Sequence, residues 1–170
     1  NMANLYMTSP DGLGMAAGVA GTLVGAYWFL MLCGRLVGGA VGGKVSSRAM
    51  MTAVSSAAIV FILLGMFLPK TWTMGLLGAE VPVGMLFFVI CGLCTSIMWG
   101  AIFNLAVEGL GRYTSIASGL FMVMVCGGGI LPLVQGAVAD AAGYVNSYWV
   151  LIAALVYTLW FALYGSKTNK

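Results

Sequence analysis

The 170-residue sequence has no histidine and few charges: seven Lys or Arg and four Asp or Glu, together 6% of the chain. A typical soluble domain is roughly 25% charged, so these side chains cannot cover a surface that faces water. The composition therefore argues against a soluble globular fold. Intrinsic disorder is excluded as well, because 62% of the residues are apolar and the mean hydropathy is +1.06.

The missing histidine also removes most catalytic chemistry. The usual zinc sites, the Ser-His-Asp triad and haem with a histidine ligand all need an imidazole. Cys91 and Cys94 have the CxxC spacing of redox motifs, but they lie in an apolar stretch with no flanking cation to lower a thiol pKa. We interpret them as small packing residues, and we expect no enzyme activity, no cofactor and no metal site.

In place of charge, the sequence has apolar runs that are long enough to cross a bilayer. A hydrocarbon core of about 30 Å needs about 20 apolar residues in an α-helix. The runs are continuous, whereas the strands of a transmembrane barrel alternate polar and apolar residues. The sequence thus predicts an all-α, polytopic transmembrane helix bundle. Its helices are expected at about residues 12–43, 49–69, 81–108, 113–139 and 144–166, after a helix end at residues 1–9.

Basic residues between the runs predict the orientation. The linkers on one side of the membrane carry Lys44, Arg48, Arg112, Lys167 and Lys170, and those on the other side carry only Lys70. By the positive-inside rule the first side is cytoplasmic, which places the carboxy terminus in the cytoplasm. The rings of Trp72, Tyr144, Tyr148 and Trp149 are expected at the opposite interface, which amphipathic rings favour.

A small group of polar residues within the runs could bind a ligand. Ser96, Trp99 and Phe103 recur at steps of three and four residues, which places them on one helical face, and Asn104 follows them. An indole plane beside small polar groups suits a neutral polar ring such as a sugar, whose faces stack and whose hydroxyls form hydrogen bonds. The alternative is a tryptophan packed between helices, with Asn104 and Gln135 bonded to neighbouring helices.

Glycine and proline mark two special segments. Gly127, Gly128 and Gly129, followed by Pro132, weaken a helix within a run, because glycine disfavours helix order and proline removes a backbone donor. The break is either a static kink or a gating hinge. In the first run a stripe of small residues predicts the close approach of a neighbouring helix. This stripe consists of Gly14, Gly18, Gly21, Gly25, Gly34, Gly38 and Gly42.

We expect Arg35, Glu108 and Arg112 to form a charge cluster at the cytoplasmic end of the bundle. Glu108 and Arg112 are four residues apart and can pair on a helix, but Gly109 and Gly111 interrupt that turn, and Arg35 is an equally good partner for Glu108. The cluster either favours one closed state of a transporter or is an ordinary interfacial ion pair. Neither a carboxylate nor a cation is expected deep within a run, so ion coupling would need a group elsewhere.

Residues 96–111, SIMWGAIFNLAVEGLG, resemble the bacterial fucose–proton symporters and glucose/galactose permeases, a branch of the major facilitator superfamily. Ser118-Gly119, residues 127–132 (GGGILP) and residues 136–143 (GAVADAAG) match the same branch in order and spacing, and residues 34–39 (GRLVGG) resemble its eighth helix. Two departures stand out. Gly100 replaces a common proline, and Gly43 replaces the acid of a Gly-x-x-x-Asp-Arg loop, so we assign no conformational latch to that loop.

The resemblance implies the carboxy-terminal half of a twelve-helix transporter, from the end of helix seven to helix twelve. It places helices seven and ten on the central cavity. The implied substrate-binding residues are therefore Asn1, Asn4, Ser96, Trp99 and Asn104. The implied partners are a sugar substrate, a coupling cation, the lipid bilayer and the missing amino-terminal half, with no nucleic acid. The protonatable carboxylates of this branch lie in that amino-terminal half.

The expected function is secondary active transport of a monosaccharide of the fucose or glucose/galactose type, by alternating access and coupled to a cation, for which we expect the proton. The expected location is the bacterial inner (plasma) membrane, with several passes of the chain. The alternative is a small self-contained membrane channel or scaffold protein without transport coupling.

Overall fold

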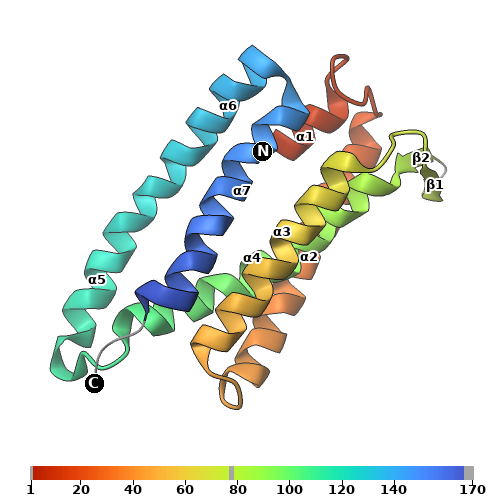
Figure 1. The fold of residues 1–170 in the computed structure, drawn as a ribbon. Coiled ribbons are helices and arrows are strands. Elements are labelled where there is room, and N and C mark those ends of the chain that lie inside the picture. The colour runs from red at the N-terminus through yellow and green to blue at the C-terminus, as the bar shows by residue number, and fades with distance from the viewer. Residues whose placement is uncertain (1, 77–78, 167–170) are drawn as a thin grey trace.

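Long apolar helices dominate the computed structural model, which describes residues 2–76 and 79–166. Among these residues, four helices are long and apolar enough to cross a membrane: α2 (Ala17–Gly42), α3 (Ser47–Phe67), α4 (Val83–Val107) and α7 (Tyr144–Trp160), which the π-helical turn η3 (Phe161–Gly165) extends. The helices form a bundle whose connections lie at its two ends (Figure 1). The predicted all-α transmembrane bundle is confirmed.

A further helical rod runs along the side of the bundle. The helix α5 (Thr114–Met124), the 3-10 segment η2 (Val125–Gly129) and the helix α6 (Ile130–Ala142) follow one another without a gap, and Figure 1 shows them as one rod beside α7. The span expected at residues 113–139 lies in this rod, which the 3-10 segment η1 (Gly111–Tyr113) precedes. The short helix α1 (Met2–Thr8) lies at the end of the bundle where α6 leads into α7 (Figure 1).

Local residue chemistry sets several helix ends. Gly14, at φ +59°, lies in the turn before α2, so the helix expected from residue 12 begins at Ala17. Gly143, at φ +89°, joins α6 to α7. This left-handed backbone region is readily open only to glycine. At the start of α3, the Ser46 hydroxyl caps the helix by accepting a hydrogen bond from the Ala49 N–H.

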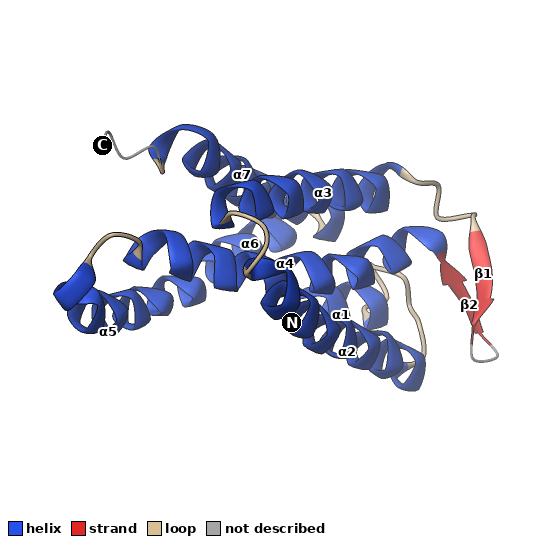
Figure 2. Ribbon diagram, turned by 90° about the horizontal axis from the view of Figure 1, so that it is seen from below, coloured by secondary structure: helices blue, strands red, loops and turns tan. Residues whose placement is uncertain are grey.

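A two-stranded hairpin projects from one end of the bundle (Figure 2). Its antiparallel strands are β1 (Thr73–Leu76) and β2 (Ala79–Pro82), and Thr73 lies opposite Pro82. The helix expected from residue 81 therefore begins at Val83, because strand pairing holds the chain extended as far as Pro82.

The helix α4 packs against both α2 and α3 and forms the centre of the bundle. These contacts depend on glycine. A Cβ added at Gly92 would lie 2.6 Å from the Tyr27 carbonyl oxygen of α2, and one added at Gly84 would lie 2.9 Å from the Gly65 carbonyl oxygen of α3. Small residues let helix backbones approach closely in lipid, where no hydrophobic force drives helices together.

The predicted glycine stripe on α2 is only partly a packing surface. A Cβ added at Gly34 would lie 2.7 Å from the Leu93 carbonyl oxygen of α4, so this glycine does allow close approach. Within α2, the stripe members that meet no atom within 4 Å and lie exposed are Gly18, Gly21 and Gly25, and the same holds for Gly14 in the turn before this helix. These three residues of α2 contact no helix among the described residues, because this part of α2 turns a different face, with the buried Ala20 and Leu23, toward the bundle.

An arginine connects the start of α3 to the end of the last helix. The Arg48 Nε donates a hydrogen bond to the Ser166 hydroxyl oxygen at 2.9 Å, and its Nη2 donates to the Ser166 carbonyl oxygen. The last carbonyl groups of a helix have no partner within that helix. The guanidinium therefore satisfies one of them, and its positive charge is favourable at the negative end of the helix dipole.

We predict that Gly92→Ala destabilises the protein, because the new methyl group would overlap the Tyr27 carbonyl oxygen. Overpacking of this kind costs about 1–3 kcal/mol, which should lower the melting temperature of the detergent-solubilised protein. Gly21→Ala is the matched control, since it adds the same methyl group to a helix where no atom lies within 4 Å. A melting temperature that falls no further for Gly92→Ala than for Gly21→Ala would contradict this account of the packing.

Candidate functional site

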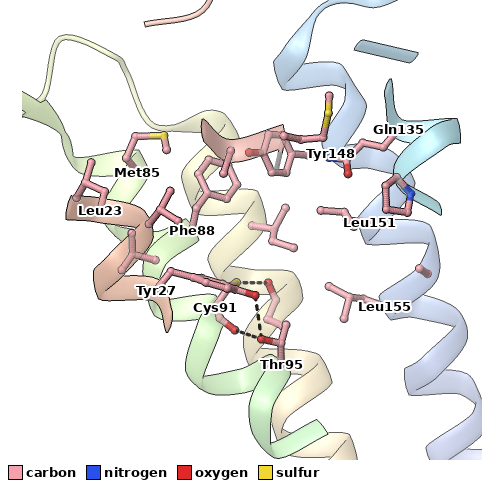
Figure 3. A pocket seen from close by; sticks show the side chains of 18 of the residues that line it. Leu23, Tyr27, Met85, Phe88, Cys91, Thr95, Gln135, Tyr148, Leu151 and Leu155 are labelled. Carbon is pink, nitrogen blue, oxygen red and sulfur yellow. Dashed lines mark hydrogen bonds between the residues drawn. The ribbon is translucent and has the colours of Figure 1, made fainter. Parts of the chain in front are cut away.

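The larger of two prominent cavities lies between α2 and α4 on one side and α6 and α7 on the other (Figure 3). Its volume is about 670 Å³. Apolar side chains such as Leu23, Met85, Leu151 and Leu155 form most of its wall (Figure 3). A hydroxylated ligand would find few hydrogen-bonding partners on such a surface.

Most polar groups of the larger cavity are already bonded within the bundle. The Thr95 hydroxyl donates to the backbone of the preceding turn of α4, at 3.0–3.1 Å. The Tyr27 hydroxyl of α2 lies 3.3 Å from the Thr95 hydroxyl (Figure 3). The Gln135 amide nitrogen lies 3.5 Å from the Ser147 hydroxyl of α7. Gln135 therefore bonds to a neighbouring helix, which is the alternative to ligand binding that the sequence left open.

Tyr148 differs from these residues. Its ring stacks on Phe88 of α4 with the centroids 4.4 Å apart, 4% of the residue is exposed, and its buried hydroxyl has no hydrogen-bond partner. The sequence predicts this tyrosine at the membrane interface, and the structure places it inside the bundle instead. The reason is that α7 turns the face with Tyr148, Ile152 and Leu155 inward, while Trp149 remains 49% exposed. The spacing of these three residues at i, i+4 and i+7 is the signal that the interface argument missed.

The smaller cavity brings together three of the residues predicted to bind a substrate. It lies between α2 and α4 and has a volume of about 310 Å³, within the range of about 300–1,000 Å³ of ligand pockets. Ser96, Trp99 and Asn104 line it from α4, and Arg35 lines it from α2. Glycines on both helices contribute to its wall, which leaves the space open.

Trp99 is held by other rings yet stays accessible. Phe121 of α5 meets its ring nearly edge on, with the centroids 5.6 Å apart and the planes at 65°. The same phenylalanine contacts Phe103, with centroids 5.4 Å apart. Trp99 is nonetheless 42% exposed. An indole that is both supported and accessible can stack on the apolar face of a ring.

Ser96 and Asn104 supply the polar groups of the smaller cavity. The Ser96 hydroxyl is buried and has no hydrogen-bond partner, although buried polar groups are normally bonded. Asn104 is exposed, and in the described part of the chain its side chain makes no hydrogen bond to protein. The Asn104 amide is therefore free to bond to a ligand, and the Ser96 hydroxyl lacks a partner within the described bundle.

Asn4 does not join this group. It is exposed on α1, and it lines neither cavity. Its carbonyl oxygen accepts a hydrogen bond from the Thr8 hydroxyl at 2.9 Å. Asn1 lies outside the described residues, so the role implied for these two asparagines stays a prediction.

Within residues 2–76 and 79–166, Arg35, Glu108 and Arg112 form no ion pair with one another. The helix α4 ends before Glu108, and Gly109 (φ +79°) and Gly111 (φ +49°) then turn the chain. This turn breaks the helical spacing that would place Glu108 beside Arg112. The Arg112 Nη2 instead donates to the Tyr113 hydroxyl at 2.7 Å, and its guanidinium lies 4.9 Å from the centre of that ring.

The glycine–proline segment changes the type of helix. Residues 125–129 form the 3-10 segment η2, and Pro132 lies in the first turn of α6. Backbone N–H groups in a first turn have no α-helical partner, so proline loses no such bond there. Pro132 also lines the larger cavity. A gating role for Gly127, Gly128, Gly129 and Pro132 stays a prediction.

Comparisons with known proteins find sugar transporters. The chain is 29% identical over 163 residues to a glucose/galactose transporter of Brucella abortus, which covers 96% of this chain and 37% of that protein. It is 32% identical over 149 residues to a putative glucose/galactose transporter of Helicobacter pylori (85% and 34%), and 28% identical over 157 residues to an L-fucose-proton symporter of Escherichia coli (91% and 33%). The chain thus spans about a third of the length of these curated relatives. No family model and no solved structure matches it.

The apolar helices describe a multi-pass helical membrane protein, and its relatives are transporters. The resemblance seen in the sequence is confirmed: the chain is homologous to the glucose/galactose transporter and fucose–proton symporter branch of the major facilitator superfamily. These relatives are transporters and not enzymes.

We predict that Phe121→Ala destabilises the protein and loosens Trp99. Two aromatic contacts of about 0.5–1.5 kcal/mol each are lost. This loss should lower the melting temperature in detergent and increase the mobility of the Trp99 indole. Phe67→Ala is the control, because Phe67 is 71% exposed and has no recorded ring contact in the described residues. If both variants had the melting temperature of the wild type, the contacts of Phe121 with Trp99 and Phe103 would not contribute to stability.

Proposed function

We propose that the chain forms part of a monosaccharide carrier and contributes the smaller cavity to its substrate site. The observation that carries the proposal is the convergence of Ser96, Trp99 and Asn104 on one cavity of about 310 Å³. The glucose/galactose transporter and the L-fucose-proton symporter among the relatives support this class of substrate. The lengths of the relatives support a role as one half of a larger transporter, which we take to be the carboxy-terminal half.

The chemistry of the smaller cavity matches that of a sugar. A pyranose has an apolar face and a rim of hydroxyls, so its binding needs an aromatic plane next to hydrogen-bonding groups. Trp99 provides the plane, while the unbonded Ser96 hydroxyl and the exposed Asn104 amide provide donors and acceptors. The larger cavity is a weaker candidate, because its wall is mostly apolar and its Thr95 and Gln135 side chains already have partners.

Coupling to protons is the finer part of the proposal. The name of the fucose-proton symporter supports it. The four described spans α2, α3, α4 and α7 contain no Asp or Glu, and membrane-embedded carboxylates are the usual sites of proton coupling. The coupling carboxylate is therefore expected outside these helices. Transport would proceed by alternating access around a site near the middle of the membrane, as in other secondary transporters.

The orientation follows from the basic residues. Lys44, Arg48 and Arg112 all lie in or next to the connections at one end of the bundle, and the positive-inside rule makes that end cytoplasmic. The carboxy terminus would then be cytoplasmic as well, in a bacterial inner membrane.

We predict that Trp99→Ala in the full-length transporter raises the KM for monosaccharide uptake on the order of tenfold, because stacking on the sugar is lost. Uptake of radiolabelled glucose, galactose and fucose into proteoliposomes measures this. Trp72→Ala is the matched control: it removes another exposed tryptophan, which lies beside the hairpin and lines neither cavity. Unchanged uptake by Trp99→Ala would remove the smaller cavity from the substrate site. A wild-type protein that carries none of the three sugars would overturn the proposed function.

We also predict that an inward proton gradient drives uphill sugar uptake by the wild-type proteoliposomes. A protonophore should abolish accumulation and leave exchange of labelled for unlabelled sugar intact, since exchange needs no net proton movement. Accumulation that persists with the protonophore and follows a sodium gradient would assign the coupling to sodium. Equilibration without accumulation under either gradient would instead indicate a channel or a uniporter.

A further inference from the structure

Arg35 lies within a membrane-spanning helix. It is seven residues from the end of α2 at Gly42, which is about 10 Å at 1.5 Å per residue. From the sequence, this residue is expected in a charge cluster at the cytoplasmic end of the bundle. In the structure α2 continues for seven residues beyond Arg35, so this cation belongs to a candidate membrane-spanning helix and not to the connection that follows it.

No acidic residue of the described chain neutralises this charge. The helices that surround it, α2, α3 and α4, contain no Asp or Glu, and Arg35 takes part in no ion pair or hydrogen bond within residues 2–76 and 79–166. Unpaired charges within membrane spans are unfavourable, and they typically face a cavity and mark a substrate path.

The surroundings of Arg35 leave its side chain access to the smaller cavity. Its neighbours Gly34, Gly38 and Gly39 have no side chains, and all three line the cavity with it. The opposite wall carries Trp99 and the Asn104 amide. A planar cation, an indole and an amide thus surround one space of about 310 Å³.

We propose that Arg35 is a substrate-binding and specificity-determining residue, whose guanidinium donates hydrogen bonds to two adjacent oxygen atoms of a neutral monosaccharide in the smaller cavity. The proposal rests on the proposed function and extends it. The guanidinium presents its N–H groups as a rigid fork that matches a pair of neighbouring oxygens. Adjacent ring hydroxyls form such a pair, while Trp99 stacks on the face of the same ring.

The proposal distinguishes Arg35 from a residue that only supplies positive charge. Lysine keeps the charge and loses the fork, so Arg35→Lys isolates the geometry. In the full-length transporter we expect this variant to raise the KM for the preferred monosaccharide on the order of tenfold to a hundredfold, because a hydrogen bond to a charged group is lost. We expect kcat to change less than KM.

Deoxy sugars identify the contacted hydroxyls. Competition by a series of glucose analogues, each lacking one hydroxyl, is measured for the wild type and for Arg35→Lys. For the wild type, we expect the analogues that lack the contacted hydroxyls to inhibit uptake poorly. For the variant, we expect them to inhibit uptake as well as glucose does, because the variant no longer forms hydrogen bonds to these hydroxyls. The proposal would be overturned if, for every analogue, the inhibition constant relative to that of glucose were the same in Arg35→Lys as in the wild type. Stronger competition by a glucuronate than by glucose would overturn the neutral class of ligand.

Two further variants complete the test. Lys44→Gln removes a cation from the loop after α2, outside both cavities, and should leave KM and the analogue series unchanged. Arg35→Gln replaces Arg35→Lys if the latter does not reach the membrane, and the same loss of discrimination is expected. If Trp99→Ala weakens sugar uptake and the Arg35 variants do not, the role of Arg35 is wrong while the sugar site stands. If the wild type carries no monosaccharide, the proposed function itself fails.

Discussion

The absence of water from the bilayer core is the constraint on which the rest of the structure depends. Every backbone N–H and C=O group there needs a partner inside the protein, which selects helices, and these helices must associate without a hydrophobic force between them. Glycine provides the contact, since Gly84 and Gly92 let α4 lie directly against α3 and α2. The same constraint makes unbonded polar groups informative, because a buried polar group without a partner is unfavourable.

The two cavities differ in how many of their polar groups are bonded within the bundle. The larger one is lined by apolar side chains, and its Thr95 and Gln135 are bonded to the bundle, so its chemistry is nearly that of a protein core. The smaller one leaves a hydroxyl and an amide unbonded beside an accessible indole. The buried hydroxyls of Tyr148 and Ser55 also lack a partner in the described part of the chain, so what distinguishes the smaller cavity is the combination of an exposed amide with an accessible indole. Volume alone would select the other cavity from the one that we propose for a sugar.

Composition and run length were sufficient to predict the all-α transmembrane fold. Charged residues make up only 6% of the chain, so most of its surface must face lipid and not water. The common face of Ser96 and Trp99 also followed from helical spacing. The sequence failed where the outcome depended on which face a helix turns inward. Tyr148 looked like an interfacial ring and is buried on Phe88, and the glycines at 18, 21 and 25 looked like a contact and lie exposed. Gly109 and Gly111, which the sequence already marks as interrupting the turn between Glu108 and Arg112, adopt left-handed backbone conformations, and the two charged residues do not pair within the described chain.

The 3-10 segment between α5 and α6 has a geometric consequence. Each residue of a 3-10 helix advances the chain by about 120° around the axis and 2.0 Å along it, against about 100° and 1.5 Å in an α-helix. Over Val125–Gly129 the difference amounts to roughly a quarter turn and a rise of about 2.5 Å. A helical wheel drawn through α5 and α6 as one α-helix would therefore misplace the buried Gln135 of α6 by about a quarter turn.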